Sequence, residues 1–407
     1  MFIELCVFLV TAFFAYALYN HNRMKNFFTE NGLKYKPFYP IFGNNLQSTF
    51  KQKHMVEDLD EVYRAFPNEK YVAYMEGGKP HLLIRDPDLI KQITVKDFDH
   101  FVDHKEFFPV EVEPLFGNSV FMMKGERWRD MRSTLSPAFT SSKMKLMMPF
   151  MTEISNNIVK YIKGSLKTEK GEDDETGLAP FVQNNRSTTK WTPDELAGQV
   201  FIFFIAGFES SASTLVLCLH ELALNYEVQD KLYQEIRNYE EKNGKLVFEK
   251  INELNYLECV LNEALRKWSV ALALDRMCTK TYELPPPREG GKPYTMKPGD
   301  LLLCTVNSIH MDPKYFPDPK AFNPDRFLEE NKHKIKPFTF LPFGAGPRNC
   351  IGIRFAMMEL KVLLFHLVAN FEIQKCEKTQ DPAELAPLDL IIAAKGGSWV
   401  KFVPRNK

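Results

Sequence analysis

Most apolar stretches of this chain are long enough for helices, and only a few are short enough for strands. The run from Ile353 to Phe371 predicts one long helix. Thr192-Pro193-Asp194-Glu195 is typical of a helix start, and the helix that it predicts runs past Cys218. Another helix is expected to begin at Asp86-Pro87, because Asp is a good N-cap and Pro suits the first helical position. Three more helices are expected at Lys124–Ser136, Asn225–Lys242 and Leu254–Trp268.

Short β-strands interrupt these helices at a few places. Tyr71–Met75 and His81–Ile84 flank a Gly-Gly pair and predict a β-hairpin. Leu301–Val306 predicts a single strand, and Leu390–Ala394 with Trp399–Val403 predicts a second hairpin. The pattern therefore favours a mostly α fold with small β-sheets, of the α+β class.

The N-terminal segment differs from the rest because its apolar run is almost uninterrupted. Phe2 to Tyr19 carries one charge, and about 18 residues at a rise of about 1.5 Å each nearly cross a bilayer core. Arg23 and Lys25 follow, and positive charge on that side keeps the downstream body in the cytosol. The alternative, a cleaved secretory signal, has its positive charge before the apolar run. We therefore expect a membrane anchor in residues 1–20 and a basic, proline-containing hinge in residues 21–45.

Composition limits the class of partner more than the class of fold. The 407 residues carry no net charge, which gives no sign of a nucleic-acid partner. The seven cysteines are odd in number and widely spaced, so they indicate neither a disulfide framework nor a CxxC zinc site. A reducing compartment is therefore expected for the main body.

One glycine-rich loop, PFGAGPRNCIG, places a single cysteine just before the long C-terminal helix. A helix N-terminus stabilises negative charge, so Cys350 is expected as a thiolate. Gly346 and Gly352 leave open space on either side of the sulfur, so a flat ligand could approach closely. Phe343 could stack on that ligand, and Arg348 could pair with an anionic group on it. The flat anionic ligand that needs a thiolate is haem. A lone cysteine taken by itself is more often a small buried hydrophobe.

The spacing of these residues resembles the cysteine-ligand loop of the cytochrome P-450 monooxygenases, whose signature reads FxxGxRxCxG. Every fixed position of that signature is present. The resemblance implies a cytochrome P-450-like fold, a haem-thiolate catalytic domain in residues 46–407, and Cys350 as the protein ligand of the haem iron. It also implies that Phe343, Gly346, Arg348 and Gly352 bind the cofactor.

A charged pair and a second arginine match further motifs of this family. Glu263 and Arg266 match its ExxR motif, and their spacing puts both on one helix face. Arg326, in FNPDRF, matches its PxRF element, and in the family the three residues form a buried cluster on the proximal side of the haem. A surface ion pair of little energetic value is the alternative for the first two residues.

The helix expected from Lys124 matches the family's WxxxR motif. Trp128 and Arg132 lie four residues apart, on one face, and both are hydrogen-bond donors. In the family they contact haem carboxylates, as does the position matched by Arg276. A solvated basic face is the alternative, because Arg127 and Arg129 are close in sequence.

The long helix from Thr192 contains FIFFIAGFESSAS, which resembles the family's oxygen-side helix. Ala206 matches the first residue of the family's small pair beside the cofactor, and the following glycine, which costs about 1 kcal/mol in a helix, leaves room for a bound oxygen molecule. Glu209 and Ser210 are then the catalytic acid–alcohol pair, suited to passing protons. The family usually has threonine in place of Ser210, so we expect less well coupled oxygen activation. A Ser-Ser run on a buried helix is the alternative.

The resemblance also implies substrate, partners and location. The Phe-rich loop His100–Ser119 is expected over the distal haem face, although its rings would equally suit an ordinary core. This loop and WRDMRSTLSPAF are similar to insect microsomal members linked to foreign-compound metabolism, which implies a lipophilic substrate. Electrons would come from NADPH through a flavin reductase, and the protein would lie in the endoplasmic reticulum membrane with its catalytic domain facing the cytosol.

The chain departs from the family between Arg132 and Thr192. These residues lie too close in sequence for the family's middle helices, and a polar segment uses much of the interval. We expect an internal loss near residues 161–191 that opens the distal side and uncovers Phe201, Phe204 and Phe208. The alternative to an active monooxygenase is therefore a catalytically defective relative that binds haem weakly or not at all. A reactive-cysteine hydrolase is a weaker alternative, since no His lies near Cys350 in the sequence.

Overall fold

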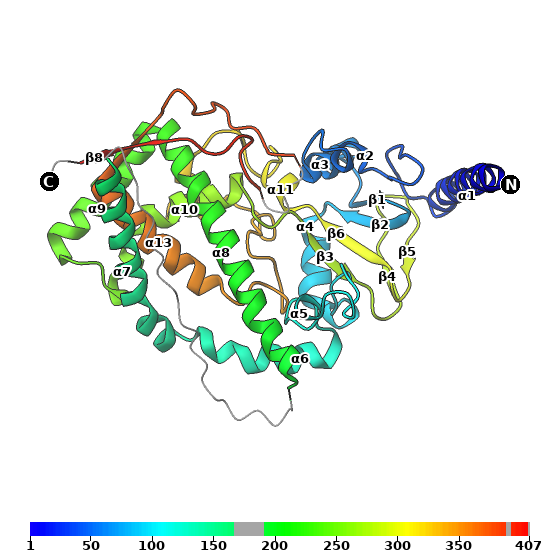
Figure 1. Ribbon diagram of the computed structural model, residues 1–407, viewed down its shortest axis with the longest axis horizontal. Helices are drawn as coiled ribbons and strands as arrows, with labels where there is room; N and C mark the ends of the chain where they lie inside the picture. Colours follow the sequence, from blue (N-terminus) through cyan, green and yellow to red (C-terminus); the bar gives the residue numbers. More distant parts are fainter. Residues whose placement is uncertain (167–190, 388–391, 406–407) are drawn as a thin grey trace.

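The computed structural model describes residues 1–166, 191–387 and 392–405, and in them helices predominate over three small β-sheets (Figure 1). The helices are α1 (Phe2–Glu30), α2 (Leu46–Thr49), α3 (Met55–Ala65), α4 (Pro87–Lys91), α5 (Pro114–Gly117), α6 (Gly125–Leu135), α7 (Ser141–Ser165), α8 (Pro193–Leu224), α9 (Tyr226–Asn243), α10 (Asn255–Lys267), α11 (Val306–His310), α12 (Glu329–Lys332) and α13 (Ile353–Asn370). The strands are β1 (Tyr71–Glu76), β2 (Lys79–Ile84), β3 (Leu274–Met277), β4 (Tyr282–Leu284), β5 (Tyr294–Met296), β6 (Leu301–Cys304), β7 (Phe371–Gln374) and β8 (Lys401–Pro404). The α+β class predicted from the sequence is confirmed.

Local sequence signals account for several element boundaries. The Asp86 carboxylate accepts a hydrogen bond from the Leu89 N–H at 2.8 Å and so caps α4. Thr192 and Glu195 form a capping box at the start of α8. Both helix starts are those predicted from the sequence.

The largest sheet has the strand order β1-β2-β6-β3. The predicted hairpin is confirmed, since β1 and β2 are antiparallel with Tyr71 opposite Ile84. Strand β6 pairs parallel to β2, and β3 pairs antiparallel to β6 at the sheet edge. Because β3 contains Arg276, the sheet fixes the position of one predicted cofactor-binding residue.

The predicted C-terminal hairpin is wrong in its pairing. Strand β8 pairs with β7, which follows α13 directly, with Phe371 opposite Pro404. The rings of Phe371 and Phe402 pack edge to face at 5.5 Å, so burial beside the α13 core outweighs the local turn signal. Residues 390 and 391 of the expected partner strand lie outside the described residues.

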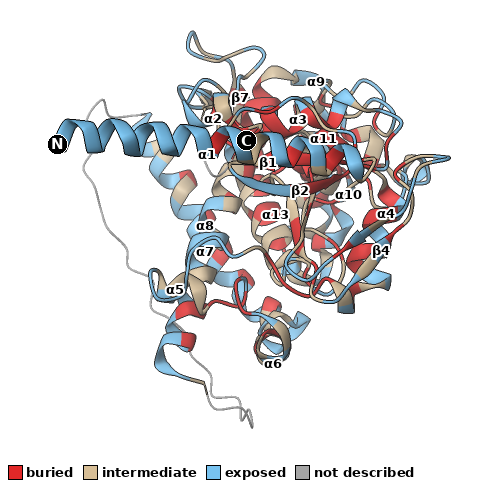
Figure 2. Cartoon of the chain, turned by 90° about the vertical axis from the view of Figure 1, so that its right-hand side faces the viewer, coloured by how far each residue is buried: buried red, intermediate tan, exposed pale blue. Residues whose placement is uncertain are grey.

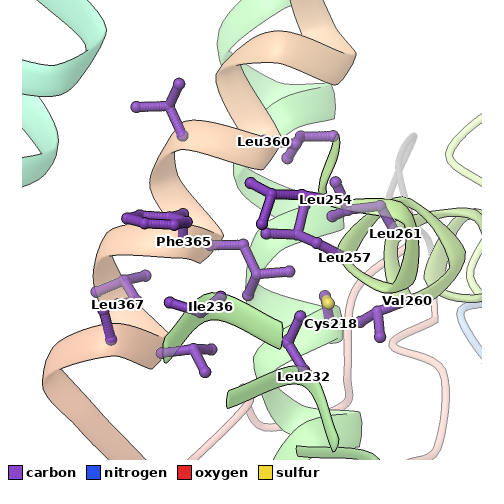
Figure 3. Packing of buried hydrophobic residues seen from close by; sticks show 14 of the residues in the cluster. Cys218, Leu232, Ile236, Leu254, Leu257, Val260, Leu261, Leu360, Phe365 and Leu367 are labelled. Atoms are coloured by element: carbon purple, nitrogen blue, oxygen red, sulfur yellow. The ribbon is translucent and has the colours of Figure 1, made fainter. Parts of the chain in front are cut away.

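Two large hydrophobic cores, with two smaller clusters, hold the described chain together. The first lies among α7, α9, α10, α13 and the C-terminal half of α8, and Figure 3 shows Leu232, Leu257 and Phe365 within it. The second packs α3 and the end of α1 on the four-stranded sheet. Leu341 and Ala345 belong to the second core, whereas Phe340 and Phe355 pack against the first. The cysteine loop therefore joins the two cores.

Two of the described helices, α1 and α8, are long and apolar enough to cross a membrane. The first half of α1 lies free of the body and is exposed along its length (Figure 2). The helix continues past the predicted anchor into the expected hinge, where Met24 and Phe28 are buried. Helix α8 instead contacts α5, α9, α10 and α13, as expected for a helix of the folded body.

The middle of α8 is exposed in the described structure. Phe204 is 69% exposed and Phe208 is 62% exposed, and Phe201 is half-buried. Leu146 and Phe150 on α7 are exposed as well. The predicted uncovering is thus confirmed for the two outer phenylalanines. The rings of Phe204 and Phe208 stack on each other with centroids 6.3 Å apart, and exposed apolar side chains of this kind favour aggregation or partner binding.

Candidate functional site

Cys350 lies in an open cavity at the start of α13. Its backbone N–H donates to the Phe343 carbonyl at 2.8 Å, and the Asn349 N–H donates to the Gly346 carbonyl at 3.0 Å, so two turns fix the loop. The cavity has a volume of about 270 Å³ and is lined by Arg132, Ser136, Phe139, Cys350, Ile351, Ile353 and Arg354. Cys350 contributes the one thiol of this lining, and Arg132 contributes a positive charge from α6.

The electrostatics at Cys350 contain opposing effects. Burial of the sulfur within the cavity walls raises the pKa of the thiol, whereas the Gly352 N–H and Arg132 lower it. Burial outweighs the other two, so the expected thiolate preference is wrong for the protein chain by itself. The two opposing groups are still those that a thiolate requires, and a bound cation would add to them.

The two glycines that flank the cysteine serve different purposes. Gly346 has φ +73°, and a Cβ there would lie 1.7 Å from the Thr94 carbonyl oxygen, so close backbone packing requires it. A Cβ at Gly352 would lie 3.9 Å from the Cys350 sulfur. The interpretation of Gly346 as an opening for a ligand is therefore corrected, while Gly352 borders the sulfur.

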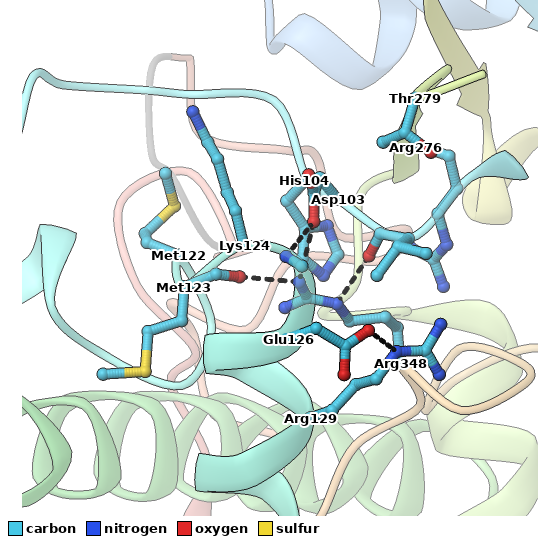
Figure 4. Close-up of polar contacts among 12 residues, drawn as sticks. Asp103, His104, Met122, Met123, Lys124, Glu126, Arg129, Arg276, Thr279 and Arg348 are labelled. Carbon is cyan, nitrogen blue, oxygen red and sulfur yellow. Dashed lines mark hydrogen bonds and ion pairs between the residues drawn. The ribbon is translucent and has the colours of Figure 1, made fainter. Parts of the chain in front are cut away.

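Arg348 does not point freely into the cavity. Its guanidinium donates to the carbonyl oxygens of four residues at 2.6–3.3 Å, namely Val102, Val120, Phe121 and Met123. Figure 4 shows it between this segment and Asp103, whose carboxylate lies 3.6 Å away. The Trp128 ring lies under the guanidinium at 4.0 Å. Arg348 and Trp128 thus brace the Phe-rich loop against α6.

Arg132, Arg276 and Arg348 lie close enough to one another for their positive charges to interact. Burial, and then the nearby Arg276 and Arg132, lower the pKa of Arg348 to about 9 despite the opposing effect of Asp103. Among the described residues the buried Arg276 Nε has no hydrogen-bond partner, while Arg132 Nη2 donates to Asn349 Oδ1 at 2.9 Å. An unpaired buried donor within a group of mutually repelling arginines favours an anion. The residues present therefore fit haem, which carries carboxylates as well as iron.

Sequence reasoning missed two acidic partners of this cluster. Asp275 accepts hydrogen bonds from the Lys105 N–H at 2.6 Å and pairs with His104 Nδ1 at 2.9 Å. Asp103 accepts from the Gly125 N–H at 2.8 Å. Asp103, His104 and Lys105 form a polar, charged run within the Phe-rich loop. This run is the sequence feature that could have indicated these contacts.

The Glu263 cluster is buried, as the resemblance implies. Glu263 and Arg266 are both 0% exposed, and two hydrogen bonds join their side chains at 2.7 and 2.8 Å. Arg326 Nε lies 3.4 Å from a Glu263 oxygen, which also accepts from the Asn323 N–H at 2.8 Å. The alternative of a surface ion pair is therefore wrong.

The residues predicted for the oxygen side lie in the middle of α8. Ser210 donates its hydroxyl to the Ala206 carbonyl in the same helix, and Glu209 is exposed, as is Ala206. The acid–alcohol contact that does form joins Ser211 to Glu359 on α13 at 2.7 Å. Burial raises the pKa of Glu359. Contact between α8 and α13 could not be read from either helix alone.

Comparison with known proteins shows what this chain resembles. The profile of the family described as Cytochrome P450 matches residues 33–185 and 165–400. "Cytochrome P450 9e2" of Blattella germanica is 32% identical over 98% of this chain and 97% of that protein. "Probable cytochrome P450 9f2" of Drosophila melanogaster is 31% identical over 94% and 95%, and "Cytochrome P450 6j1" of Blattella germanica is 28% identical over 94% of both.

The comparisons also bear on the length of the chain. The alignment with the first relative runs over 524 positions, whereas this chain has 407 residues, so part of the relative has no counterpart here. The two family matches overlap at residues 165–185. The chain is thus shortened relative to its family, and the position of the loss near residues 161–191 stays a prediction.

Proposed function

This chain belongs to the cytochrome P450 family of haem-dependent monooxygenases, and from that premise we propose that it oxygenates a lipophilic small molecule with electrons from NADPH, delivered by a flavin reductase. Haem, when bound, supplies the activation of dioxygen that no side chain can provide. The observation that supports this most strongly is the preserved proximal side, in which Cys350 lines a cavity next to Arg132 and packs in a loop joined to both cores.

The chain's own residues would bind and orient the cofactor. In this proposal Cys350 would ligate the haem iron, and Arg132 and Arg276 would hold the haem carboxylates. Gly352 would leave space beside the sulfur. Phe343, Gly346, Trp128 and Arg348 shape the loop and its support, and Ala206 faces the cofactor from α8. A thiolate ligand favours cleavage of the O–O bond.

On the distal side, Glu209 and Ser210 are proposed to move protons. Ser210 would have to turn its hydroxyl away from the Ala206 carbonyl, which is a rotation about χ1 alone. The exposed α8 surface excludes water poorly, so we propose that electrons are partly lost to peroxide.

The location follows from α1. Its exposed first half would cross the membrane, and Arg23 and Lys25 at its end favour an orientation with the catalytic domain in the cytosol. We propose the endoplasmic reticulum membrane, where the reductase and lipophilic substrates would meet the enzyme.

A second candidate function is favoured by the exposed apolar faces of α7 and α8. A chain without its middle helices can be a catalytically defective relative that holds haem weakly or not at all. It would then retain the proximal scaffold without turnover.

Two measurements decide between these candidates. A reduced, carbon-monoxide-treated sample of the full chain should show the red-shifted absorption band of thiolate-bound haem. Product formed per NADPH consumed, with reductase and a panel of lipophilic compounds, then measures turnover and its coupling. Absence of the band would overturn the monooxygenase proposal, and a band without any product would favour the defective relative.

A further inference from the structure

His310, the last residue of α11, joins the Glu263 cluster to the cysteine loop. Its side chain is fully buried between the two. Ring atom Nδ1 lies 3.1 Å from the Arg266 carbonyl oxygen, and ring atom Nε2 accepts a hydrogen bond from the Leu341 N–H at 2.9 Å. The His310 carbonyl in turn accepts from Arg266 Nη1 at 2.9 Å.

These partners determine the protonation of the ring. A carbonyl oxygen can only accept, so Nδ1 must carry a hydrogen, and a backbone N–H can only donate, so Nε2 must be bare. One neutral tautomer satisfies both contacts. Burial and the adjacent Arg266 charge lower the pKa of His310 to about 3, so the ring stays neutral at physiological pH.

Aromatic packing holds the ring in this orientation. Phe340 stacks on it with ring centroids 5.4 Å apart, and Phe316 meets it edge-on at 6.0 Å. Since Phe340 precedes Leu341 in the chain, the ring contacts both residues that lead into the cysteine loop. A flip of the ring by about 180° would put Cδ2 and Cε1 in place of the two nitrogens and remove both hydrogen bonds.

The hydrogen bonds continue from Leu341 toward the sulfur. The Leu341 carbonyl accepts from the Gly344 N–H at 3.1 Å, and the Phe343 carbonyl accepts from the Cys350 N–H at 2.8 Å. The start of the loop therefore sets where its end lies. We propose that His310 is a positioning residue, whose bare Nε2 fixes the entry of the cysteine loop to the Arg266 backbone and thereby places Cys350.

This proposal rests on the proposed function only in that Cys350 is the iron ligand. The effect on the loop itself is a property of the protein chain. A measurement on haem-free protein therefore separates failure of the positioning proposal from failure of the haem assignment.

Two conservative variants separate the two contacts of the ring. In His310→Gln the amide oxygen can reach the place of Nε2 and still accept from Leu341. In His310→Asn the amide nitrogen takes the place of Nδ1 and still donates to Arg266, but the Leu341 N–H loses its acceptor. Both variants lose the aromatic ring, and they differ from each other in volume by one methylene group.

The test is amide hydrogen exchange of the full, haem-free chain, followed on peptides that cover residues 341–350. We expect roughly tenfold faster exchange in His310→Asn than in His310→Gln, because one variant leaves a buried donor unpaired. His220→Asn, at another fully buried histidine that contacts the Gln380 carbonyl, should leave these peptides unchanged. Equal exchange in the Gln and Asn variants would overturn the proposal and leave His310 a packing residue.

A measurement on the unaltered chain remains decisive if a variant fails to fold. Nitrogen NMR of histidine-labelled protein should show His310 with a protonated Nδ1 and a bare Nε2. The opposite tautomer, or a charged ring at neutral pH, would overturn the proposal. After haem is added, His310→Asn should lose more of the thiolate-type absorption band than His310→Gln. An unchanged band together with faster loop exchange would contradict the link to Cys350.

Discussion

The Glu263 cluster and the middle of α8 differ in how completely they are covered. Glu263 and Arg266 are 0% exposed, and every nitrogen and oxygen of their charged groups is hydrogen-bonded. Phe204 and Phe208 on α8 are 69% and 62% exposed. The chain therefore keeps a fully buried ion cluster while the outer face of α8 has little cover.

Removal of the proximal sulfur should have the largest effect. We expect Cys350→Ala to abolish the thiolate-type absorption band of the haem-loaded protein, because no other cysteine lines the cavity. Thermal melting of the haem-free chain should change little, since Cys350 lines an open cavity and belongs to neither hydrophobic core. Cys376→Ala is the control and should keep the band. Survival of the band in Cys350→Ala would refute the ligand assignment.

Breaking the buried cluster should have the next largest effect. Glu263→Ala should lower the free energy of unfolding by about 3–5 kcal/mol, because it leaves Arg266 buried without its partner. Glu241→Ala on α9 removes an exposed pair with Arg237 and should cost less than about 1 kcal/mol. Denaturant titration measures both. Equal losses would show that the cluster is no more important than a surface pair.

The Ser211–Glu359 contact joins α8 to α13, and its loss should have a smaller, pH-dependent effect on stability. Because burial raises the pKa of Glu359, its protonated form stabilises the fold at acidic pH, and this contribution is lost as the pH rises through the raised pKa. Glu359→Gln keeps an acceptor for Ser211. It should therefore raise the free energy of unfolding by about 1 kcal/mol at neutral pH and leave it unchanged at acidic pH. Parallel pH curves for the two proteins would contradict this.

Substitution on the exposed face of α8 should have the smallest effect on stability. Replacing both Phe204 and Phe208 by Gln should change the free energy of unfolding by less than about 0.5 kcal/mol, because these rings have little cover to lose. The same double variant should aggregate less in light scattering. Leu257→Ala, within the first core, is the control and should cost about 2–5 kcal/mol. A comparable loss of unfolding free energy in the Phe204/Phe208 double variant would show that other residues cover these two rings.

Local signals in the sequence determined much of this protein. Asp86 and Thr192 begin helices because the capping groups lie within three residues of the N–H groups that they satisfy. The β1–β2 hairpin follows from a short turn between two apolar runs. The cysteine loop could be recognised because its motif residues are close in sequence.

Contacts between distant segments were decided only by the tertiary structure. The pairing of β8 with β7, the hydrogen bond from Ser211 to Glu359, and the four carbonyls around Arg348 all join parts of the chain that no local pattern connects. Burial decided the protonation of Cys350 and His310, since the pKa of a group depends on what surrounds it in space. Sequence therefore specified which residues carry the chemistry, and packing decided which atoms of those residues are free to perform it.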